Sequence, residues 1–148
     1  DTIFAQAVTS LRARECTLEM MLVNPTYCIP PSKPTDPRPY QAAIDELSQV
    51  QRVSLPLTKL QMVLSAYRTI CRCVAEYYSD SKKQVVMGAD DLLPIFSYCL
   101  VYSEIECAFS ELAFMSDFIL EDDLNGEMGY VLATLHTSLH IVSHFDEG

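Results

Sequence analysis

Glycine is scarce in this chain, which has only four glycines among its 148 residues. A loop that cradles phosphates needs several glycines at fixed spacing, because its backbone N–H groups must approach the phosphates closely. Gly88, Gly126, Gly129 and Gly148 do not have that spacing. The sequence therefore argues against a phosphate-binding loop of the chain's own, and we do not expect the protein to hydrolyse nucleotides itself.

Basic residues are also few, 10 against 20 acidic residues, which gives a net charge of −10. Nucleic-acid binding depends on Lys and Arg side chains that neutralise phosphates. Docking on an anionic membrane needs the same charges. We therefore expect no nucleic-acid partner and no unaided membrane docking. The acidic surplus suits a partner with a basic surface, but it equally describes a solvated acidic coat.

The chain lacks long apolar runs and closely paired cysteines. The longest uncharged apolar run, residues 92–102, is too short to span a bilayer and contains Pro94, so we expect no direct membrane insertion. The six cysteines include no CxxC pair for zinc, and several lie in apolar helical patterns, which indicates a reducing cytoplasmic compartment. Because the sequence begins at Asp1 and ends at Gly148, we interpret it as a fragment of a larger protein.

Apolar residues recur at helical spacing along most of the sequence. The expected helices cover residues 3–23, 40–53, 56–78, 90–102, 106–120 and 127–145. Six of the eight prolines fall in residues 25–39, which predicts an extended connector, either a linker or a strap over the helices. The predicted fold class is all-α, a layered bundle of about six helices with a proline-rich connector after the first helix.

We interpret residues 1–148 as a single domain. Residues 1–39 would form the first helix and the connector, and residues 40–148 the helical core that carries any functional site. The segment 90–102 is apolar on every side, so its helix should be central in the bundle. Pro94 is tolerated only near a helix start, which places that start close to Asp90.

Acidic residues at the start of this central helix allow two interpretations. Asp90 and Asp91 can cap the free N–H groups and favour the positive end of the helix dipole. Alternatively, one carboxylate projects outward beside an apolar surface.

The last helix raises a similar question. Its face opposite the core stripe is uncharged and consists of Tyr130, Ala133, Thr134 and Thr137. A solvated helix face is normally charged, so this one indicates a contact surface. The alternative is that Tyr130 packs under a neighbouring helix or under the proline-rich connector.

Two spaced motifs resemble the vacuolar-protein-sorting-nine (Vps-nine) domain family, the exchange modules of the Rab-five subfamily of small GTPases. The motifs are GADDLLP at residues 88–94 and GEMGY at residues 126–130, with Phe114 between them. Residues 57–61 and 67–71 resemble the family's preceding helix. The resemblance covers roughly residues 54–143.

The resemblance implies that the chain promotes GDP release from a Rab-five-subfamily GTPase. Asp90 matches the acidic finger that disturbs the nucleotide and Mg²⁺ site, and Asp91 supports it. The predicted contact surface comprises Pro94, Tyr130, Ala133 and Thr134, beside a groove between the Asp90 helix and the last helix. Such a regulator needs no cofactor and does no covalent chemistry. The family implies a cytoplasmic protein, recruited peripherally to endosomal membranes through regions outside this sequence.

The sequence departs from the family pattern at two positions. Ala133 stands where members usually carry Thr or Ser, which puts affinity or partner choice in question. Glu111 stands where an asparagine is common. A rival hypothesis is therefore a non-catalytic helical module that binds a GTPase or a scaffold partner without exchange.

Metal binding is the remaining alternative. Residues 121–126 imitate the opening of a calcium loop, but its twelfth position, which should be a bidentate Glu, is Leu132. His136, His140 and His144 share a helix face and could hold zinc, yet the usual third type of ligand is not evident. We expect a row of surface histidines and no metal site.

Overall fold

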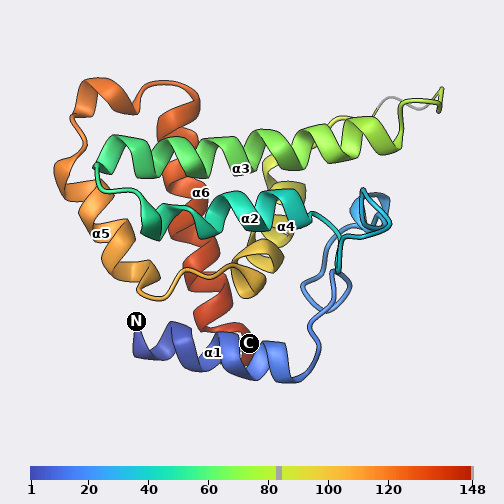
Figure 1. Ribbon diagram of the computed structural model, residues 1–148, viewed down its shortest axis with the longest axis horizontal. Helices are drawn as coiled ribbons and strands as arrows, with labels where there is room; N and C mark the ends of the chain where they lie inside the picture. The colour runs from blue at the N-terminus through green and yellow to red at the C-terminus, as the bar shows by residue number, and fades with distance from the viewer. Residues whose placement is uncertain (83–84, 148) are drawn as a thin grey trace.

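The computed structural model describes residues 1–82 and 85–147, and this part of the chain is all-helical, with no β-strand (Figure 1). Its α-helices are α1 (Thr2–Ala13), α2 (Gln41–Ser48), α3 (Pro56–Tyr77), α4 (Ala89–Tyr102), α5 (Ala108–Phe118) and α6 (Glu127–Ser143). Short 3-10 turns complete it: η1 (Pro25–Tyr27), η2 (Val50–Arg52), η3 (Glu121–Leu124) and η4 (Phe145–Glu147). The predicted all-α bundle of about six helices is confirmed.

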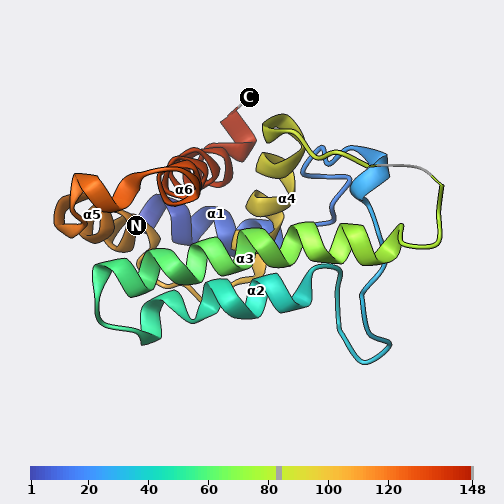
Figure 2. The same ribbon diagram turned by 90° about the horizontal axis from the view of Figure 1, so that it is seen from above.

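Helices α4 and α6 are the centre of the packing, because each contacts several other helices. Figures 1 and 2 show α2 and α3 side by side, with α6 crossing the pair. Helix α6 packs against α1, α3, α4 and α5, while α4 packs against α1, α2 and α6. Eight of the fourteen residues of α4 are buried, as its apolar sequence predicts. Within the described part, no helix has both the length and the apolarity to cross a bilayer.

The first helix is shorter than the sequence predicts, because α1 ends at Ala13 and not near residue 23. Glu15 adopts a left-handed conformation with φ 51°. Its N–H donates to the Arg12 carbonyl, and the Cys16 N–H donates to the Leu11 carbonyl, both at 3.0 Å. This is a helix-ending motif that usually employs glycine, and the absence of glycine here hid the end of the helix. The apolar residues beyond the end are nevertheless buried: Cys16, Leu18, Met21 and Val23.

Helices α3 and α6 begin at the expected residues 56 and 127, whereas α5 begins at Ala108, two residues later than expected. Helix α3 begins at Pro56, where proline fills the first helical position and its missing N–H costs nothing. Helix α4 begins at Ala89, one residue before the expected start at Asp90.

The proline-rich connector lies against the helices as a strap. Tyr27 and Ile29 are buried in the same apolar core as the helices. Tyr40, which precedes α2, is also buried and donates its hydroxyl to the Tyr27 carbonyl at 2.6 Å. Because these side chains share the core, residues 14–40 are part of the folded unit.

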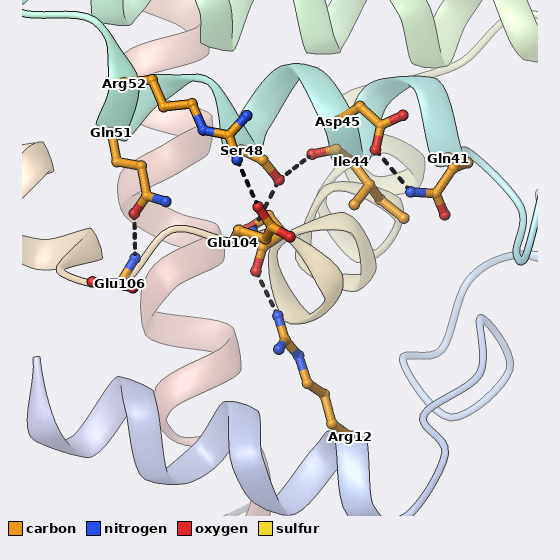
Figure 3. A network of polar contacts seen from close by, with 10 residues as sticks. Arg12, Gln41, Ile44, Asp45, Ser48, Gln51, Arg52, Glu104 and Glu106 are labelled. Atoms are coloured by element: carbon orange, nitrogen blue, oxygen red, sulfur yellow. Dashed lines mark hydrogen bonds and ion pairs between the residues drawn. The ribbon is translucent and has the colours of Figure 1, made fainter.

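A polar network fixes the junction between α4 and α5 (Figure 3). Arg12 of α1 donates to the Val101 carbonyl at 2.6 Å and to the Ser103 carbonyl at 2.5 Å. From α2, the Ser48 hydroxyl accepts the Glu104 N–H at 2.9 Å. Helices α1 and α2 therefore satisfy polar groups where α4 ends, a point at which carbonyls lack intrahelical donors.

Candidate functional site

The two aspartates at the start of α4 have different surroundings. The Asp91 carboxylate accepts the Gly88 N–H at 3.0 Å, and the Asp91 N–H donates to the Gly88 carbonyl at 3.1 Å. This reciprocal pair caps the helix. Asp90 is exposed, and its carboxylate has no hydrogen bond or ion pair with any residue that the structure describes. The Asp91 carboxylate therefore serves as the helix cap, whereas the Asp90 carboxylate is available to an incoming partner.

Pro94 is the sixth residue of α4 and is half-buried. Proline has no backbone N–H, so the Asp90 carbonyl, four residues earlier, receives no helical hydrogen bond. The Leu92 N–H still donates to the Gly88 carbonyl at 3.1 Å and keeps the first turn helical. The turn that carries Asp90 is consequently held at its cap but lacks one bond to the next turn.

Tyr130 lies in the first turn of α6 and is 38% exposed. Its ring packs edge-on against Tyr67 of α3, with ring centroids 5.7 Å apart. Both interpretations of Tyr130 thus hold in part, since it leans on a neighbouring helix and still presents surface. Ala133, one turn later, is exposed.

Thr134 does not lie on this surface, contrary to the sequence analysis. Its side chain is buried, at 6% exposure, and its hydroxyl donates to the Tyr130 carbonyl at 2.9 Å. The reason is that α6 packs on several sides, so its buried stripe is wider than that of a one-sided helix. The structure thus buries Thr134, one helical turn after Tyr130, and leaves Ala133 exposed.

A glycine holds the acidic turn η3 against the start of α6. A Cβ atom on Gly129 would come within 2.3 Å of the Leu124 carbonyl oxygen, so any larger residue would push the two backbones apart. Beside it, Glu127 pairs with Arg68 of α3 at 3.0 Å, and this hydrogen bond lowers the pKa of the Glu127 carboxyl. These contacts fix the turn that carries Tyr130.

An apolar hollow of about 530 Å³ lies beside the start of α4. Its wall combines residues of α3, the turn after it and the segment just before α4, namely Cys71, Val74, Ala75, Tyr78, Ser81, Val85, Val86 and Met87. Cys71 is one helical turn from Tyr67, which contacts Tyr130. The sequence placed a groove between α4 and α6. The structure instead shows that α3 contacts both Tyr130, through Tyr67, and the segment before α4, through the hollow. The sequence did not predict this role of α3.

A largely buried ion pair, which the sequence does not predict, lies outside this surface. The Lys59 Nζ of α3 lies 2.7 Å from the Glu111 Oε2 of α5 and donates to the Val50 carbonyl at 2.8 Å. Glu111, the departure from the family's asparagine, therefore joins α3 to α5. No periodic pattern signals such a pair, because its two charges lie far apart in the sequence.

The histidine row is present but gathers no further ligands. The His136 and His140 rings are 4.9 Å apart, and the His140 and His144 rings 6.1 Å. In the described ranges, no three His, Cys, Asp or Glu residues come together in a way that could hold a metal ion.

Comparison with known proteins gives the family. The model of the vacuolar sorting protein 9 (VPS9) domain matches residues 40–147. VPS9 domain-containing protein 1 of Homo sapiens is 33% identical over 129 residues, which cover 80% of this chain and 20% of that protein. Protein sprint of Drosophila melanogaster is 31% identical over 121 residues, 76% of this chain and 6% of that protein. Ras and Rab interactor 2 of Mus musculus is 21% identical over 112 residues, 72% of this chain and 12% of that protein. The chain thus spans a fifth or less of each relative, and it belongs to the VPS9 domain family.

Proposed function

We propose that this chain promotes GDP release from a small GTPase of the Rab-five subfamily, with Asp90 as the acidic finger. The observation that carries the proposal is the exposed Asp90 carboxylate at the start of α4, which has no partner among the described residues, while the Asp91 carboxylate caps the helix. One relative is named Ras and Rab interactor 2, which supports a small GTPase as the partner.

The chemistry is electrostatic. A GTPase holds GDP with a P-loop lysine and a Mg²⁺ ion. A carboxylate that enters this site pairs with the lysine and repels the β-phosphate. Two like charges 4 Å apart repel by about 4 kcal/mol at the effective dielectric near a protein surface. GDP then leaves, and GTP refills the site.

The remaining residues prepare the contact surface. Tyr130 and Ala133 would meet the mobile switch segments of the GTPase, and Pro94 would shape the finger turn. Thr134 would stabilise the turn that carries Tyr130 through its hydrogen bond to the Tyr130 carbonyl. No cofactor is needed. Recruitment to endosomal membranes would depend on regions outside residues 1–148.

The test is release of fluorescent GDP from a panel of Rab GTPases. Wild type should accelerate release from Rab-five-subfamily members. Asp90→Ala and Asp90→Asn should lower kcat/KM by about a hundredfold, because both remove the carboxylate charge. A hundredfold drop corresponds to about 2.7 kcal/mol of barrier. The matched control is Asp117→Ala, because Asp117 is an exposed helical aspartate on α5, away from the start of α4. Equal loss in the control, or no stimulation by wild type, would refute the proposal.

The rival is a module that binds a GTPase or a scaffold partner without exchange. The exposed Ala133 favours it, because this position of the contact surface offers no hydroxyl. Calorimetry that detects GTPase binding, together with unstimulated GDP release, would support this rival.

A further inference from the structure

Tyr27 of the connector reaches the segment that leads to Asp90. Its hydroxyl donates to the Val86 carbonyl at 3.1 Å, four residues before Asp90. Residue 27 lies outside the range 40–147 that the family model matches. A side chain from the connector therefore holds the backbone just ahead of the acidic finger.

Tyr27 is well suited to hold a neighbour because it is itself fixed. Its ring is buried, and its carbonyl accepts the Tyr40 hydroxyl at 2.6 Å. The adjacent Thr26 carbonyl accepts the hydroxyl of Tyr78, near the end of α3. The strap is thus attached to the start of α2 and to the end of α3 at the point where it meets residue 86.

Apolar contacts flank Val86, because the side chains of Val85 and Met87 are partly buried against the core. The Val86 side chain is 85% exposed, and Gly88 is exposed too. Ordering one residue of free backbone costs about 1–2 kcal/mol, and the net contribution of one hydrogen bond is of the same size, so the bond to the Val86 carbonyl offsets the cost of ordering that residue. The hydrogen bonds of the Gly88–Asp91 cap follow directly after Met87.

The phenol keeps its proton at neutral pH. Burial raises the pKa of Tyr27, and the nearby Asp91 carboxylate and Tyr78 raise it further. The hydroxyl therefore remains a donor to the Val86 carbonyl.

We propose that Tyr27 is a positioning residue for the acidic finger: its hydrogen bond to Val86 holds residues 86–91 so that Asp90 faces the partner. This inference rests on the proposed exchange function. Tyr27 does not touch the nucleotide. It increases the fraction of molecules in which the finger is presented, and the rate of release scales with that fraction.

The test is Tyr27→Phe, which keeps the buried ring and removes only the hydroxyl. We expect kcat for GDP release to fall by about fivefold to tenfold, the effect of losing one hydrogen bond. The affinity for nucleotide-free GTPase should change less than kcat. Deuterium uptake over residues 85–91 should become faster, and in an Asp90→Ala background the change should cause no further loss of activity.

Tyr102→Phe is the matched control. Tyr102 also joins the N-terminal segment to α4, through its hydroxyl and the Cys16 carbonyl at 2.7 Å, but at the opposite end of the helix. It should leave kcat and uptake over residues 85–91 unchanged. An equal drop in kcat for both variants, or wild-type kcat and uptake in Tyr27→Phe, would overturn the inference.

Failure of the proposed function gives a different result. If wild type releases GDP from no GTPase in the panel, the exchange function fails and the positioning role fails with it. If wild type is active and Tyr27→Phe is equally active, only the positioning role fails.

Discussion

Glu111→Gln should lower the free energy of unfolding by about 3 kcal/mol, because it leaves the Lys59 ammonium buried without its counter-charge. Lys59 is 7% exposed and Glu111 is 21% exposed, so water replaces the lost partner poorly. The only other contact of Nζ with an acceptor in the described chain is the Val50 carbonyl. Stability thus depends on a pair that joins α3 to α5.

The magnitude follows from the geometry. Two opposite charges 2.7 Å apart attract each other. At an effective dielectric constant of 20 this attraction is about 6 kcal/mol, and desolvation of both groups offsets much of it. Breaking a buried pair by removing one partner costs about 3–5 kcal/mol. The partial exposure of Glu111 puts the expected cost at the lower end.

Urea unfolding followed by far-UV circular dichroism is the suitable assay, since the chain contains no tryptophan to serve as a fluorescence probe. The matched control is Glu104→Gln, which breaks the exposed 3.0 Å pair with Arg52 and should cost less than about 1 kcal/mol. The double variant Lys59→Met, Glu111→Leu should recover most of the lost stability, because it leaves no unpaired charge. If Glu111→Gln costs no more than Glu104→Gln, the reasoning is wrong.

Three further changes test the site. Gly129→Ala should destabilise the chain by about 1–3 kcal/mol, although alanine normally favours a helix, because its Cβ meets the Leu124 carbonyl; a higher melting temperature would contradict this. Asp91→Ala should cost about 1 kcal/mol by removing the acceptor of the Gly88 N–H, as urea unfolding can measure, and an unchanged midpoint would rule out that contribution. Ala133→Thr should tighten GTPase binding by about twofold to tenfold in calorimetry if the added hydroxyl gains one hydrogen bond, and unchanged affinity would remove Ala133 from the contact surface.

Much of the fold could be predicted because local chemistry repeats along the sequence. Pro56 marks the start of α3, and Gly88 with Pro94 restricts the start of α4. The end of α1 could not be predicted in this way. The apolar spacing continues past Ala13 because those residues are buried, and burial does not require a helix. Glu15 ends the helix in a conformation that glycine usually adopts.

The candidate site was predictable only where one helix determines it. The spacing of α6 set Tyr130 apart from the core stripe, and the structure shows it partly exposed. Thr134 was misplaced because several helices surround α6, which a single helical period does not reveal. The sequence could not show that Asp91 caps the helix while Asp90 stays exposed, because this depends on side-chain geometry. It could not show the hydrogen bond from Tyr27 to Val86 either, because long-range contacts have no sequence period.

The contact between Arg12 and the end of α4 affects which residues must be included when the domain is expressed. The family match begins at residue 40, but Phe4 and Leu11 complete the core from α1. A chain that starts at residue 40 would expose the apolar faces of α4 and α6 that α1 covers. It would also leave the Val101 and Ser103 carbonyls without the Arg12 guanidinium. Exposed apolar patches of this kind promote aggregation. The stretch that the family model matches is thus narrower than the stretch that must be produced to obtain a stable sample.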